Sequence, residues 1–349
     1  MELEQLIQIP QLDATAMAQA RARQDQLTKP QGSLGRLEEL SVQIAGITGN
    51  PRPSLQDKVI LTMAGDHGVV AQGVSAFPQE VTPQMVANFL HGGAAINVLA
   101  RQVGARVVVV DMGVAVDMSG FEGLIIKKVG FGTNDFTQGP AMTPEQTVQA
   151  ILAGAEVVTA ELERGLDILG TGEMGIGNTT PATAIAAVLT GKDPGEITGP
   201  GTGLDAEGVR RKAEVIRRGI ALNQPRTEDA LDVLSKVGGF EIAGLVGAML
   251  AAAHYRRPVV VDGFISTAAA MIAQALAPDL HPYLIAAHRS QEQGHDAMLA
   301  WLELEPLLDL RLRLGEGTGA ALAMGLADAA CKVLNEMATF AEAAVAGKQ

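Results

Sequence analysis

The sequence predicts an α/β fold in which a mostly parallel sheet is flanked by helices, as in Rossmann-like proteins. Short apolar runs alternate along the chain with longer segments of helical periodicity, which is the pattern of βαβ units. The runs are Val59–Ala64, Val107–Val110, Leu166–Leu169, Val259–Val261 and Leu284–Ala287. Almost every position in them is apolar, which is typical of strands that are buried on both faces of a sheet.

The composition supports a large globular core and excludes several classes of protein. Hydrophobic residues make up 47% of the 349 residues, whereas aromatic residues make up only 3%. A single cysteine, Cys331, rules out a disulfide framework and a zinc site built from cysteines. With few aromatic residues and a formal net charge of −13, we expect no nucleic-acid partner.

No apolar stretch is long enough to span a membrane, so we expect no membrane association. The longest candidate, Ile242–Ala253, falls short of the roughly 18 residues required and is rich in Ala and Gly. The acidic N-terminus lacks the apolar run that is typical of a secretory signal. The expected compartment is therefore the cytoplasm.

The first 50 residues read as helical. Asp13–Gln26 and Ser33–Ile47 carry helical patterns, and the turn cluster Lys29–Gly35 separates them. Asn50–Pro53 then interrupts the helical pattern and marks a boundary.

The two ends of the chain are expected to form one small helical domain. The Ala-rich segment Thr318–Val345 has a helical pattern like that of the N-terminal segment. We therefore predict a discontinuous helical domain of residues 1–50 and 318–349. Residues 51–317 would form the large α/β domain that contains the active site.

Polar residues follow all five predicted strands, and glycine accompanies four of them. The segments are Gly65–Gly68, Asp111–Gly113, Gly170–Gly175, Asp262–Phe264 and His288–Ser290. In open α/β sheets, ligands bind outside the carboxyl ends of the strands. Five such segments suggest a common binding rim at this edge.

One glycine-rich segment matches a dinucleotide fingerprint by pattern. Gly170, Gly172 and Gly175 have the required spacing, but the best helix start lies later, at Thr179 or Thr180. The fingerprint requires the helix to begin inside the glycine run, so a nicotinamide-dinucleotide site is disfavoured. Backbone N–H groups and the helix start still suit a phosphate or a carboxylate, and a plain capped helix is the alternative.

Two glutamates are flanked by glycines, and one basic cluster follows another glycine loop. The flanking glycines have no side chains that shield Glu316 or Glu173, so each carboxylate could act as a general base or acid if burial tunes its pKa. The commoner alternative is a glutamate at a helix start that is favoured by the helix dipole. Arg210–Lys212 follow the loop Gly199–Asp205, either as a solvated face or with one residue reaching a phosphate. The histidines show no metal-ligand spacing, so we expect no metal site.

Long motifs run in order through nearly the whole chain. They are Lys29–Arg36, Gly65–Val69, Phe77–Thr82, Gly172–Thr180, Gly199–Gly203, Val260–Phe264, His288–Ser290 and Leu314–Ala320. In these motifs the chain resembles the nicotinate-nucleotide–dimethylbenzimidazole phosphoribosyltransferases of cobalamin lower-ligand assembly.

The resemblance implies a glycosyl transfer. A benzimidazole nitrogen attacks C1′ of nicotinate mononucleotide, nicotinate leaves, and α-ribazole 5′-phosphate forms with inversion at C1′. It implies Glu316 as the catalytic base, Glu173 as a second acidic residue and Lys212 as a basic one. It also implies a homodimer. We expect no cofactor and no metal, because nicotinate with an alkylated ring nitrogen is already a good leaving group.

The resemblance also implies a set of substrate-binding residues. The set is Ala76, Phe77, Gln84, Met174, Gly175, Gly177, Asn178, Thr179, Thr180, Gly201, Thr202, Gly203, Asp262, Ser290, Leu314, Gly315 and Gly317. Some members of the family carry Tyr where this chain has Phe77. The missing hydroxyl makes the pocket more apolar and leaves the preferred base open.

Three other functions remain as alternatives. One is a phosphoribosyltransferase of the same fold with a different acceptor base. Another is an NAD-dependent oxidoreductase that uses the glycines from Gly170 to Gly175. The third is a binding protein that kept the pocket and lost activity, although retention of Glu316 argues against it.

Overall fold

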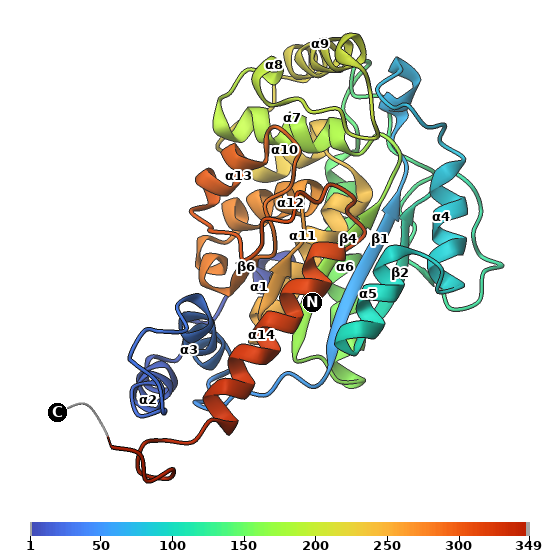
Figure 1. The fold of residues 1–349 in the computed structure, drawn as a ribbon. Helices are drawn as coiled ribbons and strands as arrows, with labels where there is room; N and C mark the ends of the chain where they lie inside the picture. Colours follow the sequence, from blue (N-terminus) through green and yellow to red (C-terminus); the bar gives the residue numbers. More distant parts are fainter. Residues whose placement is uncertain (1, 347–349) are drawn as a thin grey trace.

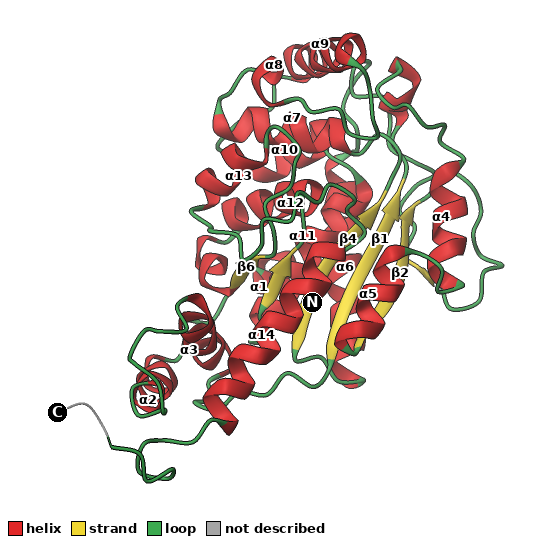
Figure 2. Ribbon diagram, in the orientation of Figure 1, coloured by secondary structure: helices red, strands yellow, loops and turns green. Residues whose placement is uncertain are grey.

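The computed structural model describes residues 2–346 and is built around one six-stranded sheet (Figure 2). The strands are β1 (Lys58–Gly65), β2 (Ala105–Gly113), β3 (Ile125–Ile126), β4 (Ile168–Met174), β5 (Val259–Val261) and β6 (Leu284–Ala286). Their order across the sheet is β3-β2-β1-β4-β5-β6, and every neighbouring pair is parallel. The predicted parallel α/β sheet is confirmed.

Each of the five predicted apolar runs contributes to a strand, but several boundaries were wrong: β2 extends through Gly113, and β4 begins at Ile168. The fourth strand extends through Met174, so Gly170–Met174 form strand instead of the predicted loop. Gly170 and Gly172 have no side chains, which lets the C-terminal helix and the segment before it pack directly on this strand. The two-residue strand β3 was not predicted, because a run of two residues carries no recognisable pattern.

Alternate strand residues face two separate hydrophobic layers, as the period of a strand requires. Val59 and Leu61 of β1 belong to one core cluster, whereas Ile60 belongs to the other. The first layer contains α6 (Pro144–Glu163), α7 (Thr179–Thr190), α10 (Ala230–Val237), α11 (Phe240–His254) and α12 (Phe264–Leu276). The second contains α4 (Val81–Leu90), α5 (Ala95–Val103) and α14 (Thr318–Glu336), and Figure 1 shows α5 and α14 side by side over the sheet.

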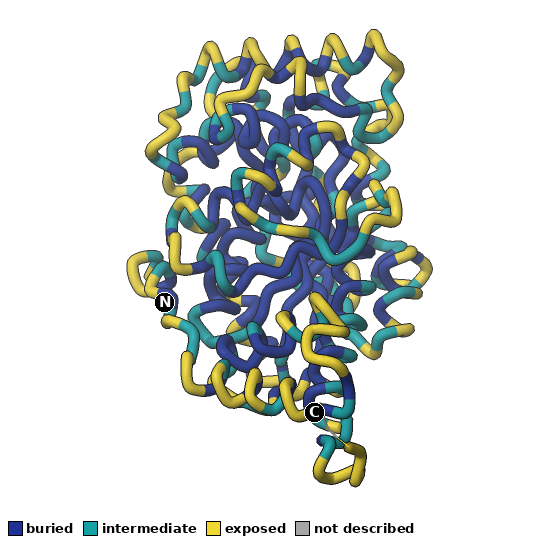
Figure 3. The backbone as a smooth tube through the Cα atoms, turned by 60° about the vertical axis from the view of Figure 1, so that its left-hand side comes forward, coloured by how far each residue is buried: buried dark blue, intermediate teal, exposed yellow. Residues whose placement is uncertain are grey.

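The apolar stretch Ile242–Ala253 lies in α11, at the centre of the first layer. Gly154 of α6 and Gly244 and Gly247 of α11 bring the two helix backbones into contact, because a Cβ at Gly154 or Gly247 would overlap a carbonyl group of the facing helix. Figure 3 shows the buried segments gathered in the middle of the molecule. None of the described helices is long and apolar enough to cross a membrane.

Helices from both ends of the chain pack together at the lower left of Figure 1. They are α2 (Ala14–Gln24), α3 (Arg36–Thr48) and the end of α14, with Ala20, Val42, Ala45 and Leu334 in a shared cluster. The first half of α14 packs on the sheet, so this helix links the two parts.

The helix α14 ends at Glu336, so the predicted helix up to Val345 was too long. The small helical domain of residues 1–50 and 318–349 stays a prediction, as does the α/β domain of residues 51–317. Residues 1 and 347–349 of that prediction lie outside the described part of the chain.

The remaining helices connect these parts. They are α1 (Leu3–Leu6), α8 (Pro194–Ile197), α9 (Ala206–Asn223), α13 (His295–Leu302) and the 3₁₀ helices η1 (Gly68–Gln72) and η2 (Pro278–Tyr283). Successive strands are added on one side of β1 and then, from β4 on, on the other side. This switch between β1 and β4 is where open parallel sheets bind ligands.

Candidate active site

A cavity of about 430 Å³ lies at the carboxyl ends of the strands, beside the switch between β1 and β4. Its walls come from the segments that follow β1, β4, β5 and β6 and from the loop before α14. The cavity therefore collects residues that are far apart in the sequence. Three of the five segments predicted to form a common rim contribute to its lining, whereas Gly65–Gly68 and Asp111–Gly113 do not.

Glu316 lies in the wall of this cavity on a strained loop. Its φ of 66° places a residue with a side chain in the left-handed region, which costs about 1–3 kcal/mol. The surrounding structure fixes this conformation: Thr62 Oγ1 donates to the Glu316 carbonyl at 3.1 Å, and Gly172 packs directly on that carbonyl. The side-chain Oε2 of Glu316 is buried and has no hydrogen-bond partner among the described residues.

Asp262 anchors the loop that carries Glu316. Its carboxylate accepts hydrogen bonds from the backbone N–H groups of Gly317, at 3.1 Å, and Ala320, at 2.9 Å. These are N–H groups at the start of α14, which have no partner within the helix. Asp262 does not line the cavity and holds the Glu316 loop in place; its role in substrate binding stays a prediction.

Glu173 is the second carboxylate in the cavity wall. It lies near the end of β4, and Asn178 Nδ2 donates a short hydrogen bond to its Oε2. Its other oxygen lies against Gly315, at a position where any side chain would overlap it. Two glycine-flanked glutamates thus meet in one cavity.

Burial displaces the pKa values of both glutamates upward. Burial raises the pKa of Glu316 to about 6, and the nearby charge of Asp262 adds to the shift. Burial also raises the pKa of Glu173 to about 8; the hydrogen bond from Asn178 opposes this shift, and the charges of Asp262 and other carboxylates add to it. At pH 7 the site therefore holds an ionised Glu316 beside a protonated Glu173, a combination suited to acid–base chemistry.

Lys212 lies one side chain behind the cavity wall. It is fully buried on α9, and its Nζ donates to Thr179 Oγ1 at 2.7 Å and to the Gly199 carbonyl at 3.4 Å. Burial lowers the pKa of Lys212 to about 8, although the charge of Glu292 opposes this shift. Lys212 does not line the cavity, but it supplies positive charge beneath Thr179 at the start of α7.

An apolar wall stands apart from these charged groups. Val81 and Met85 lie one turn apart on α4, and Phe77, Met174 and Leu314 complete the surface. Phe77 is 52% exposed and Leu314 is 57% exposed, so flat rings can reach both. Such a wall suits a bicyclic aromatic ring.

The cavity brings together most of the predicted site residues. Those that line it are Phe77, Glu173, Met174, Gly175, Asn178, Thr179, Gly201, Thr202, Ser290, Leu314, Gly315 and Glu316. Those that lie outside its lining are Ala76, Gln84, Gly177, Thr180, Gly203, Lys212, Asp262 and Gly317.

The residues outside the lining have identifiable positions. Ala76 is exposed, and its backbone N–H donates to Thr202 Oγ1 at 3.1 Å. Gln84 is exposed on α4, whereas its neighbour Met85 lines the cavity. Thr180 is buried inside α7, and Gly203 lies in the loop before α9.

Several residues of the lining were not among the predicted site residues. Gly263, Phe264 and His288 were expected only as part of the rim segments, and Val81, Met85, Ile176, Ile265, Glu292 and Arg313 were not singled out. Helical spacing from Val81 would have favoured Met85 over Gln84, since residues four apart share a helix face. Glu292 gave no sequence signal, because it follows Ser290 in a loop whose path only the fold defines.

The glycines of the apparent dinucleotide fingerprint do not form a phosphate loop. Gly170 and Gly172 lie inside β4, and α7 begins at Thr179, after Gly175. The helix therefore starts too late for the fingerprint, as the sequence indicates.

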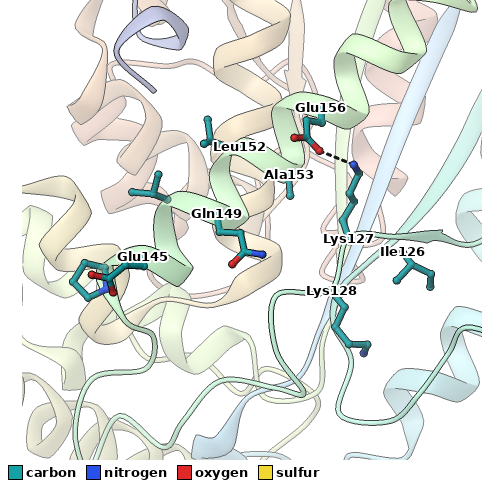
Figure 4. A pocket seen from close by; sticks show the side chains of 10 residues that line it. Ile126, Lys127, Lys128, Glu145, Gln149, Leu152, Ala153 and Glu156 are labelled. Atoms are coloured by element: carbon teal, nitrogen blue, oxygen red, sulfur yellow. Dashed lines mark hydrogen bonds and ion pairs between the residues drawn. The ribbon is translucent and has the colours of Figure 1, made fainter. Parts of the chain in front are cut away.

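A second, larger hollow of about 780 Å³ lies on the surface between β3 and α6 (Figure 4). Lys127 Nζ donates to Glu156 Oε2 at 2.6 Å there, so its main charges already neutralise each other. The cavity with Glu316 and Glu173 is the better candidate, because displaced pKa values converge in it. Across residues 2–346, no group of three or more His, Cys, Asp or Glu is arranged to hold a metal ion.

Comparison with known proteins gives a consistent result. Residues 9–345 match the family profile described as phosphoribosyltransferase. A protein of Roseiflexus sp. strain RS-1 named nicotinate-nucleotide–dimethylbenzimidazole phosphoribosyltransferase is 59% identical over 99% of this chain and 98% of its own length. A protein of the same name from Geobacter sulfurreducens is 55% identical over 98% and 97%. A crystal structure under that name from Thermus thermophilus matches with a TM-score of 0.91 and 46% identity, over 97% of this chain and 100% of the other.

Proposed function

The chain belongs to the nicotinate-nucleotide–dimethylbenzimidazole phosphoribosyltransferase family, and we propose how its cavity performs the reaction of that family. The enzyme transfers the phosphoribosyl group of nicotinate mononucleotide to 5,6-dimethylbenzimidazole or a related base. The products are α-ribazole 5′-phosphate and nicotinate, in the assembly of the nucleotide loop of cobalamin.

The observation that carries this mechanism is the position of Glu316. An ionised carboxylate with an unpartnered oxygen lies in the wall of a cavity that also has an apolar surface. A benzimidazole stacked on Phe77 and held between Met85 and Leu314 would present its N–H group to such a carboxylate. Glu316 is therefore the proposed base.

The phosphate of the nucleotide is proposed to bind beside the start of α7. Thr179, Gly201, Thr202 and Ser290 offer backbone N–H groups and hydroxyls there, and α7 directs its N-terminus toward them. Lys212 beneath Thr179 adds a positive charge that offsets the phosphate within an acidic protein.

The reaction needs one bond to form and one to break at C1′. The unprotonated ring nitrogen of the benzimidazole attacks C1′ with its lone pair, and the C1′–N bond of the nucleotide breaks. The electron pair of that bond returns to the pyridinium nitrogen, which neutralises it. Glu316 accepts the N–H proton that the base can no longer hold once it is alkylated. Positive charge that develops at C1′ is stabilised by the nearby carboxylate.

The protein is proposed to act as a homodimer in the cytoplasm on small-molecule substrates, without nucleic-acid partners. The formal net charge of −13 supports the absence of nucleic-acid binding, since the phosphate backbone repels an acidic surface. The exposed side chains of Phe77 and Leu314 at the cavity mouth offer apolar surface that a partner subunit could cover.

The direct test is the conversion of nicotinate mononucleotide and a benzimidazole to α-ribazole phosphate, followed by mass spectrometry. Glu316→Gln should lower turnover by roughly 10²-fold or more and leave nucleotide binding largely intact, since only the proton acceptor is lost. Near-normal turnover in this variant would show that another group is the base. Saturable binding of NAD(H) by calorimetry would instead support the oxidoreductase alternative.

A related base in place of dimethylbenzimidazole is the second candidate. It is favoured by Phe77, which offers no hydroxyl to the base. Parallel assays with several benzimidazoles and smaller azoles would rank the acceptors by kcat/KM.

A further inference from the structure

Glu292 is a buried carboxylate in the cavity wall that the mechanism above leaves unused. It is 5% exposed, and its Oε2 has no hydrogen-bond partner among the described residues. Its backbone is fixed: its N–H donates to Ser290 Oγ at 3.3 Å, and its carbonyl accepts from His295 N–H at 3.0 Å. The carboxylate is therefore held at a defined point of the wall.

The carboxylate of Glu292 packs closely against backbone on one side and belongs to the cavity lining. Oε2 lies directly against Gly199, where a Cβ would overlap it. The positive charge that acts on Glu292 is that of Lys212, yet Lys212 Nζ donates to Thr179 Oγ1 and the Gly199 carbonyl. A buried charge without a hydrogen bond is costly, so a bound ligand that donates to it gains affinity.

The proposed substrates carry few groups that can donate to this carboxylate. The phosphate is an anion that offers acceptors, and the carboxylate of nicotinate likewise only accepts. The N–H of the benzimidazole is assigned to Glu316, on the loop that packs against Gly172 of β4. The hydroxyls of the ribose remain, and the ribose is the part of the nucleotide next to the phosphate.

We propose that Glu292 recognises the ribose hydroxyls of the nucleotide and makes the enzyme selective for a ribosyl over a deoxyribosyl donor. This inference rests on the proposed function. The two cavity carboxylates with unpartnered oxygens then have distinct tasks: Glu316 receives the proton of the base, and Glu292 receives hydrogen bonds from the sugar.

The test combines variants of Glu292 with nicotinate mononucleotide analogues that lack the 2′- or the 3′-hydroxyl. The wild-type enzyme should lose roughly 10- to 100-fold in kcat/KM with at least one analogue, as expected for a hydrogen bond to a charged group. With the natural donor, kcat/KM of Glu292→Ala should fall by a similar factor, mainly through a higher KM. Replacing the natural donor by that analogue should then lower kcat/KM of this variant little further. Glu292→Gln, which keeps the size and one acceptor oxygen, should fall between the two. The exposed neighbour Gln291 provides the control, and Gln291→Ala should retain the full preference for the ribosyl donor.

The proposal is overturned if removal of the 2′-hydroxyl and removal of the 3′-hydroxyl each lower kcat/KM by the same factor in Glu292→Ala as in the wild type. Glu292 would then act only through the charge of Lys212, which affects all phosphorylated donors equally. Failure of the proposed function is separate, because in that case the wild-type enzyme makes no α-ribazole phosphate from the natural donor.

Discussion

Asp262→Asn tests whether the conformation of the Glu316 loop is what makes Glu316 a base. The two oxygens of Asp262 accept from two different backbone N–H groups at the start of α14, those of Gly317 and Ala320. Asparagine has the same shape but only one acceptor oxygen. Its NH₂ group would face an N–H donor, so one of the two hydrogen bonds is lost.

The expected magnitude follows from these contacts. A hydrogen bond to a buried charged group contributes about 1.5–3 kcal/mol, so the free energy of unfolding should fall by up to that amount. The left-handed conformation of Glu316 itself costs about 1–3 kcal/mol, so the weakened loop is expected to relax. A displacement of the carboxylate by about 1 Å would lower kcat on the order of 10²-fold.

The charge of Asp262 affects a second measurable quantity, the pKa of Glu316. Because the Asp262 carboxylate raises the pKa of Glu316, the neutral Asn should lower that pKa below about 6. The acid limb of the pH–rate profile should therefore move to lower pH while kcat falls. The assays are initial rates of α-ribazole phosphate formation at saturating substrate and urea unfolding.

Asp13→Asn is the matched control, because Asp13 caps α2 by accepting from Ala16 N–H at 2.9 Å, in the helical part of the chain. Asp13→Asn should lower the free energy of unfolding slightly and leave kcat unchanged. If Asp262→Asn kept the wild-type kcat and only shifted the acid limb, the hydrogen bonds of Asp262 would not be what positions Glu316. Asp262 would then have a purely electrostatic role.

Two further predictions concern the protonation of the site and the packing beneath it. The profile of kcat/KM against pH should rise near pH 6, as Glu316 ionises. It should fall near pH 8, where Lys212 loses the charge that attracts phosphate and Glu173 loses its proton. Glu316→Gln should lack the acid limb, and an unchanged limb in that variant would contradict the assignment. Gly172→Ala should lower kcat on the order of 10²-fold, because its Cβ would overlap the Glu316 carbonyl and displace the loop. Gly170→Ala on the same strand should be milder, since its Cβ meets the flexible end of Met324 at 2.8 Å, and equal losses in the two variants would argue against a specific effect on Glu316.

The sheet could be predicted because buried parallel strands are continuous apolar runs. Val59–Ala64 and Val107–Val110 lie within β1 and β2 as expected. The strand β4 was predicted too short because Gly170 and Gly172 have low strand propensity. Tertiary packing overrides that propensity: Ala320 and Met324 of α14 occupy the space that side chains would fill.

The site was only partly predictable, for a related reason. Motifs place Glu316, Glu173 and Thr179 in glycine-rich segments after strands, and these residues do line the cavity. The motifs do not distinguish a residue that lines the cavity from one behind the wall, such as Lys212. That distinction depends on the direction of a side chain from a helix, and neighbouring elements set it.

The sequence by itself determined that the protein is a parallel α/β protein of this phosphoribosyltransferase family, because strand periodicity and long ordered motifs are local properties of the chain. Only the tertiary structure decided how the carboxylates divide their tasks. The pKa values of Glu316 and Glu173 depend on burial. The position of Glu292 Oε2 depends on the missing side chain of Gly199, nearly a hundred positions earlier in the chain. Burial and unpaired hydrogen-bonding groups exist only after distant segments have packed together, so no local pattern can encode them.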